Sequence, residues 1–228
     1  MSTAAIILAA GLSRRMGRFK PLLAVGGRTV IERAVFTFRA AGIHDVRVVT
    51  GHSREELEPL LEGIGIRPVH NPGFEAGMFS SVTVGLSNLG NEVTSAFILP
   101  GDMPLVSPST VAALLSRHGE EPDRILVPCF EGRRGHPVMI PASLFTAIRS
   151  WSGEDGLKGA IDGQRLKKAD VPVRDPGILF DLDTPEDLEA ALRRFALTPA
   201  PGETEPGRCT EGREGAMGQR GMKEVCGA

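Results

Sequence analysis

The chain has 228 residues, enough for one substantial hydrophobic core. Hydrophobic residues make up 41% and charged residues 24%, a balance typical of globular proteins, and the formal net charge of -2 gives no general attraction to nucleic acid. Any anion site must therefore be local. The three cysteines lack metal-ligand spacing, which predicts reduced thiols in a cytoplasmic protein. No positively charged segment precedes an apolar run at the start, and no apolar stretch approaches the roughly 20 residues of a membrane span, so we expect neither secretion nor membrane insertion.

The first element is an apolar segment at residues 5–8, which predicts a buried strand. Small side chains follow at Ala9, Ala10 and Gly11, and they would let a ligand lie against backbone N–H groups. The next positions carry cations suited to phosphate: Arg14, Arg15, Arg18 and Lys20. The pattern indicates phosphate binding, with a solvated basic turn as the alternative. Neither a Gly-Lys-Ser/Thr triplet nor a G-x-G-x-x-G fingerprint is present.

The remaining apolar pattern alternates between helices and strands. Thr29 and Glu32 form a capping box, which predicts a helix that ends at Gly42. Further helices are expected at residues 53–61, 78–88, 107–118, in a short stretch ending at 161, and at 184–197. Strands are expected at residues 46–49, 66–69, 95–99 and 125–127, with an edge strand at 166–173. This alternation predicts a single α/β domain whose mostly parallel sheet is covered by helices on both faces, a three-layer fold.

A loop dense in turn residues, from His70 to Gly77, precedes the helix at 78–88. The first turn of this helix carries Ser80 and Ser81. A helix that starts with glycine and hydroxyl residues presents free N–H groups that could hold a polar ligand. A serine at this place is more often an N-cap, and the residues alone favour that alternative.

Two aspartates follow apolar segments. Asp102 comes after the strand at 95–99, where open α/β sheets bind ligands, although an aspartate in a turn often only satisfies local backbone groups. Asp183 follows residues 178–182, which we interpret as another strand. Thr184 as N-cap and Pro185 at the first helical position explain the next helix start but leave Asp183 free.

The loop at residues 132–137 holds Arg133, Arg134, Gly135 and His136 before an apolar segment at 138–140. These residues could grip an anionic acceptor, or they could form an exposed hairpin tip. At the other end, residues 198–228 are rich in Gly, Pro, Glu and Arg without apolar periodicity. We expect a domain at 1–197 and a disordered tail at 198–228.

The first loop resembles the signature L-A-A-G-x-S-x-R-M-G-x-x-K of nucleotidyltransferases related to the molybdenum cofactor cytidylyltransferases. Every fixed position is present: Leu8, Ala9, Ala10, Gly11, Ser13, Arg15, Met16, Gly17 and Lys20. N-P-x-x-x-x-G-M-x-x-S is matched at Asn71, Pro72, Gly77, Met78 and Ser81. Gly-Asp-Met-Pro around Asp102 and D-x-D-T-P-E-D from Asp181 also match. The resemblance extends to about Leu197 and implies a Rossmann-like nucleotidyltransferase domain.

The resemblance also implies roles for individual residues. Leu8 to Gly11 would wrap the triphosphate of an NTP, with Arg15 and Lys20 on its phosphates, while Asn71, Gly77 and Ser81 would face the base. Asp102 and Asp183 would hold Mg²⁺, and Asp181 is a less favoured substitute. Catalysis would then rest on Arg15, Lys20 and Asp102.

The implied reaction is nucleotidyl transfer to molybdopterin or its molybdenum-loaded form, with Arg134, Gly135 and His136 binding the acceptor. Leu-Ala-Ala-Gly in the loop favours CTP, because guanylyl-transferring relatives usually have Leu-Ala-Gly-Gly. A GTP-dependent guanylyltransferase or a transferase for another small phosphate acceptor is the alternative within this class. A non-catalytic carrier of the molybdenum cofactor is the alternative from another class. A molybdenum enzyme that receives the cofactor is an expected partner, whereas nucleic acid and membranes are not.

Overall fold

The computed structural model describes residues 2–13, 15–163 and 168–196. The predicted tail at 198–228, together with Arg14 and the first residues of the predicted edge strand, lies outside the described residues. No helix in the described ranges is long and apolar enough to cross a membrane.

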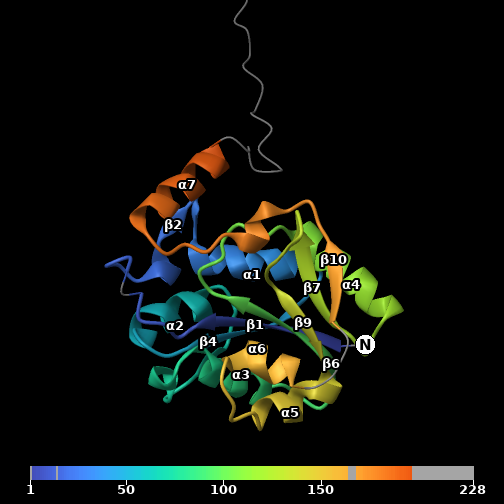
Figure 1. Cartoon of the computed structure of the whole chain (residues 1–228). Helices are drawn as coiled ribbons and strands as arrows, with labels where there is room; N and C mark the ends of the chain where they lie inside the picture. Colours follow the sequence, from blue (N-terminus) through green and yellow to red (C-terminus); the bar gives the residue numbers. More distant parts are fainter. Residues whose placement is uncertain (1, 14, 164–167, 197–228) are drawn as a thin grey trace, which may run out of the picture. The chain divides into compact units, whose positions relative to one another are not determined.

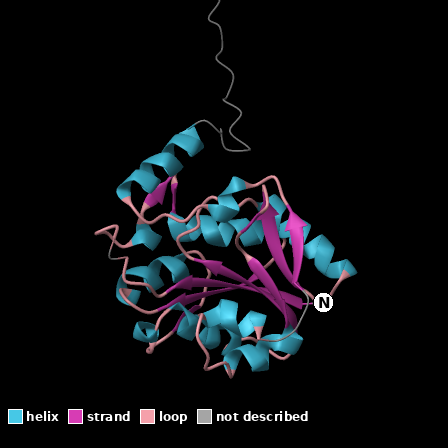
Figure 2. Cartoon of the chain, viewed as in Figure 1, coloured by secondary structure: helices cyan, strands magenta, loops and turns pink. Residues whose placement is uncertain are grey.

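An eight-stranded sheet forms the centre of the fold (Figures 1 and 2). Its strand order is β10-β7-β9-β6-β1-β4-β5, and β8 pairs with β7. The strands are β1 (Ser2–Ala9), β4 (Asp45–Thr50), β5 (Pro68–His70), β6 (Val93–Pro100), β7 (Ile125–Phe130), β8 (Arg133–Arg134), β9 (Val138–Pro141) and β10 (Lys168–Pro172). β9 runs antiparallel to both neighbours, while β6, β1, β4 and β5 are mutually parallel and β10 is parallel to β7. The predicted mostly parallel α/β sheet is confirmed.

Helices cover both faces of the sheet because its strands bury side chains in alternation. In β1, Ala5 and Ile7 pack on the side of α1 (Val30–Ala40), α2 (Arg54–Gly63) and α4 (Pro108–Glu120). Ile6 and Leu8 pack on the side of α3 (Met78–Ser87), α5 (Phe145–Arg149) and α6 (Gly156–Asp162). These two cores make the three layers that the sequence predicts. The capping box is also confirmed, with Thr29 N–H donating to Glu32 Oε2 at 2.7 Å.

A third, smaller apolar cluster holds the last helix. The hairpin of β2 (Ala24–Val25) and β3 (Arg28–Thr29) packs with α7 (Pro185–Ala196) through Val25, Leu182 and Ala191. Three-residue 3-10 turns, η1 (Lys20–Leu22) and η2 (Phe74–Ala76), precede β2 and α3, and η3 (Ala142–Leu144) precedes α5. The hairpin, η3 and α5 were not predicted from the sequence.

The predicted strand at residues 178–182 is wrong. The segment begins as the 3-10 turn η4 (Pro176–Leu179) and continues without a sheet partner. Ile178 and Leu182 have no exposed surface, and Leu179 and Phe180 are partly buried. Burial, and not strand pairing, therefore explains the apolar run.

Candidate active site

The loop after β1 forms one wall of a small pocket of about 140 Å³ at the carboxyl end of the parallel strands. Most predicted nucleotide-binding residues lie on its surface: Leu8, Ala9, Ala10, Gly11, Lys20, Gly77 and Ser81. Asp102 lines the pocket as well. Two hydrogen bonds hold the loop. His52 N–H donates to the Ala10 carbonyl at 3.3 Å, and within the loop Lys20 N–H donates to Ser13 Oγ at 3.1 Å.

Lys20 lies between the two predicted metal-binding aspartates. Its ammonium group donates to Asp102 Oδ2 at 3.2 Å and to Asp183 Oδ1 in a closer ion pair. The Lys20 side chain is nearly buried, whereas Arg15 is 74% exposed and reaches Asp183 at 2.8 Å. The sequence analysis assigned Lys20 to the triphosphate, and the structure pairs it with the carboxylates of the same site.

Asp183 reaches this position without a strand. Leu182 is buried, and its N–H donates to the Asp102 carbonyl at 2.8 Å, so the two segments are joined directly beside the pocket. The helix start then holds the backbone in place, because the N–H groups of Asp183 and Thr184 donate to Asp187 Oδ2 at 3.0 and 2.7 Å. Burial raises the pKa of Asp187, but these hydrogen bonds outweigh it and hold that pKa below its ordinary value.

The two carboxylates suit a divalent cation that prefers oxygen ligands. No backbone N–H of the described residues donates to the Asp102 carboxylate, so the local-turn alternative has no support there. Within the described ranges, no group of three or more His, Cys, Asp or Glu residues converges as a metal cage. Mg²⁺ commonly binds through one or two carboxylates, phosphate oxygens and waters, and Asp102 and Asp183 fit that donor set. The Lys20 ammonium group lies between the two carboxylates and compensates their charges.

Asn71 fixes the hydroxyl of Ser81 at the start of α3. Its Oδ1 accepts from Gly73 N–H at 2.9 Å, which orients the amide so that its NH₂ donates to Ser80 Oγ at 2.8 Å and Ser81 Oγ at 2.9 Å. Asn71 is buried behind the pocket and does not line it. The N-cap alternative for the serines is wrong, because Gly77 occupies that position with a φ of 97° and neither serine caps the helix.

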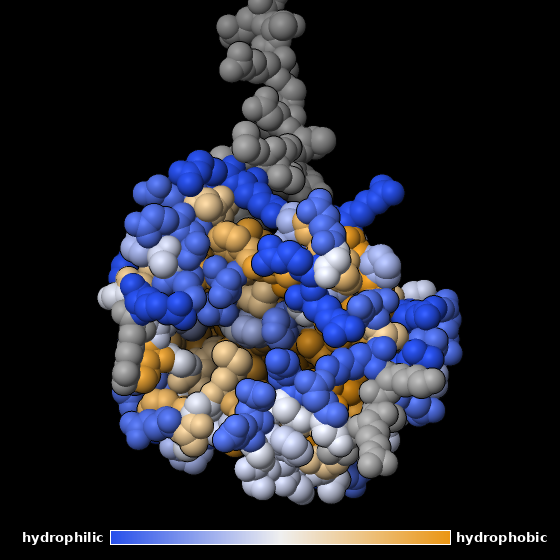
Figure 3. Space-filling view, in the orientation of Figure 1, coloured by the Kyte–Doolittle hydropathy of each residue, from blue (hydrophilic) through white to orange (hydrophobic). Residues whose placement is uncertain are grey.

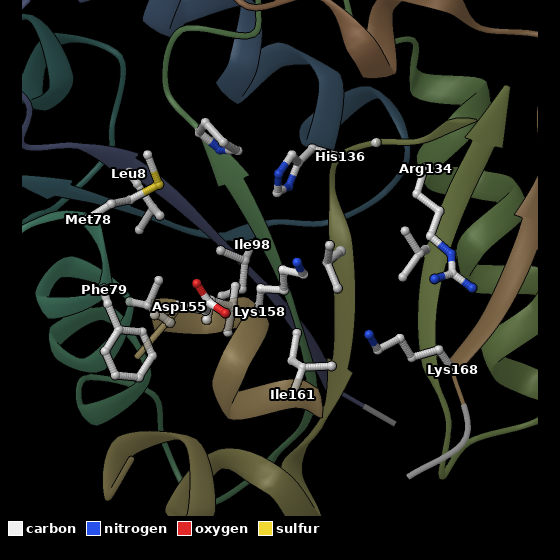
Figure 4. Close-up of a pocket in the computed structure, with 17 residues that line it drawn as sticks. Leu8, Met78, Phe79, Ile98, Arg134, His136, Asp155, Lys158, Ile161 and Lys168 are labelled. Atoms are coloured by element: carbon white, nitrogen blue, oxygen red, sulfur yellow. The ribbon is translucent and has the colours of Figure 1, made fainter. Parts of the chain in front are cut away.

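A larger cavity of about 550 Å³ lies between the sheet, α3 and α6 (Figure 4). The predicted acceptor-binding residues Arg134, Gly135 and His136 all line it. Leu8, Met78 and Pro100 line this cavity and the small pocket alike, so the two adjoin. In the orientation of Figure 1, Figure 3 shows apolar surface in a recess framed by hydrophilic residues.

The loop at 132–137 belongs to an exposed hairpin and also lines the cavity, and acceptor binding by its residues stays a prediction. Arg133 and Arg134 form the second strand of a hairpin with β7 and are exposed, and Arg134 donates to both carboxylate oxygens of Asp170 at 2.7 and 3.2 Å. Gly135 packs tightly, since a Cβ atom there would lie 2.1 Å from the Ile178 carbonyl oxygen. Burial lowers the pKa of His136, so this imidazole is neutral near pH 7.

Four further residues of the cavity walls were not assigned to a site from the sequence. Met78 and Pro100 stand where the cavity meets the small pocket, and Lys158 and Lys168 bring amino groups to the cavity. Met78 is part of a motif that had been matched, so its place could have been anticipated. No local pattern marks the two lysines.

The family follows from a comparison with known domains. Residues 5–170 of this chain match the family described as the MobA-like NTP transferase domain. The chain belongs to this family. A nucleotidyl transferase from Methanothermobacter has the same fold as this NTP transferase, with a TM-score of 0.73, 24% identity, and coverage of 87% of this chain and 99% of that one.

Two curated relatives cover nearly the whole domain. The molybdenum cofactor cytidylyltransferase of Escherichia coli K12 is 27% identical over 83% of this chain and 95% of its own length. The nicotine blue oxidoreductase of Paenarthrobacter nicotinovorans is 35% identical over 82% of this chain and 95% of its own length. Relatives of the chain thus carry names from different reaction classes, and the nucleotide and acceptor of this NTP transferase have to be argued from its site.

Proposed function

We propose that the protein transfers CMP from CTP to the terminal phosphate of molybdopterin, or of its molybdenum-loaded form, and releases pyrophosphate. The main observation in favour is the junction of two pockets at Leu8, Met78 and Pro100. One pocket is lined by Asp102 and by six residues of the phosphate-loop motif, Leu8 to Gly11, Ser13 and Lys20. The other is large enough for a second substrate. A transfer between two bound molecules requires such adjoining sites.

The chain's residues divide the work of this reaction. Backbone N–H groups of the loop around Gly11, with Arg15 and Lys20, would bind and neutralise the triphosphate. Asp102 and Asp183 would hold Mg²⁺, which supplies charge neutralisation when bound. An acceptor phosphate oxygen forms a bond to the α-phosphorus, the bond from that phosphorus to the bridging oxygen breaks, and pyrophosphate leaves. Placement and electrostatics suffice, so no covalent nucleophile is required.

The choice of CTP rests on the polarity of one hydroxyl. Ser81 Oγ accepts from Asn71, and among the described residues its own O–H has no acceptor, so it is available to donate into the pocket. Cytosine presents two adjacent acceptors, O2 and N3, to such a donor. Guanine places an N–H donor at N1 between its polar groups, which would leave one group unpaired.

Two alternatives from other classes are less well supported. A non-catalytic carrier for the molybdenum cofactor would not need the convergence of Asp102, Asp183 and Lys20. One relative is named an oxidoreductase, which favours a redox reaction, and the large cavity would admit an organic substrate for it. The nicotinamide-binding fingerprint G-x-G-x-x-G is absent from the sequence, whereas the phosphate-loop signature is complete.

Pyrophosphate release with each of the four NTPs, in the presence of Mg²⁺ and molybdopterin, tests the proposal. We expect release with CTP, little with GTP, and none when molybdopterin is omitted. Equal rates with CTP and GTP would contradict the nucleotide assignment. Tight binding of molybdopterin without pyrophosphate release from any NTP would support the carrier alternative, in which the protein delivers the cofactor to a molybdenum enzyme.

A further inference from the structure

Among the described residues, three lysine or arginine side chains line the large cavity, and they differ in whether a carboxylate is paired with them. Arg134 is paired with both oxygens of Asp170, and Lys168 is paired with Asp162. Lys158, from the first turn of α6, has no ion pair within the described part of the chain. Figure 4 shows its amino group turned toward the middle of the cavity. Lys158 is therefore the cation whose charge is available to a ligand.

The other titratable groups around the cavity do not take over this role. His136 is neutral near pH 7, because burial lowers its pKa. Asp155 lies between Phe79 and Lys158 in Figure 4, and its negative charge disfavours an anion on the side of Phe79. An anionic group in this cavity is therefore directed toward Lys158.

The walls between these charges are apolar. Ile98, Val127 and Val138 face the cavity from the sheet, and Phe79 and Ile161 face it from α3 and α6. A sugar or inositol ring would leave its hydroxyl groups without partners against such walls. A flat ring system gains burial on both faces, and a cavity of about 550 Å³ is within the size range of sites for such ligands.

The charge at Lys158 is separate from the reacting centre. Lys158 lines only the large cavity, whereas Asp102 lines only the small pocket, and the apolar or cyclic residues Leu8, Met78 and Pro100 lie at the junction. A phosphate that reacts beside Asp102 is thus not the group that meets Lys158. The ligand must span the junction to reach both.

We infer that the acceptor is a planar ring system with two separate anionic groups, a phosphate that reacts at Asp102 and a second acidic group bound by Lys158. This inference rests on the proposed nucleotidyl transfer and makes Lys158 a specificity-determining residue. It distinguishes the acceptor from small sugar phosphates, which carry one phosphate and no ring that matches these walls.

Binding of two fluorescent pterins, titrated without nucleotide or Mg²⁺, tests the inference. Pterin-6-carboxylate carries the ring and one acidic group, and 6-methylpterin carries the ring alone. We expect the wild-type protein to bind the carboxylate roughly fivefold more tightly, the factor that one ion pair at a solvent-open site supplies at most. Lys158→Met should remove this difference and leave 6-methylpterin binding unchanged, whereas Lys158→Arg should retain it. Arg54→Met, an equal change of charge on α2 across the sheet, serves as the control.

Equal binding of the two pterins by the wild type would overturn the inference, as would an undiminished preference in Lys158→Met or failure of both pterins to bind. The proposed function is judged separately by pyrophosphate release. Lys158-dependent binding without release would retain the site and reject nucleotidyl transfer. Release from CTP without a Lys158-dependent preference would retain the transfer and reject the second anionic group.

Discussion

Lys20 Nζ lies 3.2 Å from Asp102 Oδ2, although the two residues are 82 positions apart in the sequence. The same ammonium group pairs with Asp183, so one buried cation compensates two carboxylates from distant segments. This arrangement concentrates three charges at the edge of the small pocket, and it makes the site sensitive to the loss of any one of them.

Removal of the Lys20 charge is expected to destabilise the fold as well as the site. Lys20→Met leaves two neighbouring carboxylates without their shared cation, and we expect a loss of about 2 kcal/mol in the free energy of unfolding, measured by urea denaturation. Arg15→Met removes an exposed partner of Asp183 and should cost under about 0.5 kcal/mol. In Lys20→Met/Asp183→Asn, part of the loss should be recovered. Additive losses would show that Lys20 and Asp183 are not coupled.

Asp102 and Asp183 are expected to act as one Mg²⁺ site. Asp102→Asn and Asp183→Asn should each lower Mg²⁺-dependent turnover by orders of magnitude, and the double variant should be little worse than either, as for residues that act as a unit. Asp181→Asn, an exposed residue two positions away, is the matched control. If the two losses multiply, or if Asp181→Asn is the variant that fails, the shared site is wrong.

Ser81 is expected to set the preference for CTP. Ser81→Ala should lower the ratio of kcat/KM for CTP over GTP roughly tenfold, the effect of one hydrogen bond of about 1.4 kcal/mol. Ser80→Ala serves as the control, because Ser80 Oγ also bonds Asn71 but donates to the Gly77 carbonyl and does not line the pocket. Ala10→Gly should relax the preference without reversing it. An unchanged ratio in Ser81→Ala would remove the basis for base recognition by this hydroxyl.

Two glycines of the site are expected to respond differently to alanine. A Cβ atom at Gly135 would lie 2.1 Å from the Ile178 carbonyl oxygen, so Gly135→Ala should cost about 2 kcal/mol or more in stability. At Gly11 no atom lies within 4 Å of an added Cβ, so Gly11→Ala should leave thermal unfolding nearly unchanged. Its effect should appear as weaker NTP binding, measured by calorimetry, because the methyl group projects where phosphates approach. A large drop in the melting temperature of Gly11→Ala would assign that glycine to the fold.

The free energy of unfolding is expected to decrease as the pH is lowered, because a buried histidine outside the site, His118, becomes protonated on unfolding. Burial lowers the pKa of His118, and its Nδ1 has no hydrogen-bond partner in the described structure. The unfolded chain therefore binds the proton first, so stability is lost as pH falls below the ordinary value of 6.5. His118→Gln should lose less stability between pH 7.5 and pH 5 than the wild type, whereas His44→Gln, on the surface, is the control. Parallel pH profiles for the wild type and His118→Gln would contradict this account.

Local patterns predicted most of the sheet and its helices. Capping residues such as Thr29 and Glu32, and the apolar runs of β1 and β6, carry their structural information in adjacent residues. The antiparallel insertion of β9 between β6 and β7 depends on long-range pairing, which no local pattern encodes. Residues 178–182 were misassigned because an apolar run buried by irregular backbone has the same composition as a short buried strand.

The candidate site also combines residues that local motifs predict with contacts that only the fold creates. The phosphate loop and Asp102 belong to contiguous motifs, and the structure gathers them around one pocket. The pairing of Lys20 with both aspartates could not be predicted, because it depends on the path by which Leu182 reaches the Asp102 carbonyl. In the sequence, Lys158 follows a polar segment without any motif, and only the packing of α6 against the sheet places it at a cavity.

Transfer of label from CTP that carries ³²P at the α-phosphate tests nucleotidyl transfer most directly. With Mg²⁺ and molybdopterin, we expect the label to enter the acceptor in an amount equal to the pyrophosphate released, and Asp183→Asn to abolish both. Label that stays in CTP, or that appears as free CMP while the acceptor remains unlabelled, would contradict transfer at the edge shared by Lys20, Asp102 and Asp183.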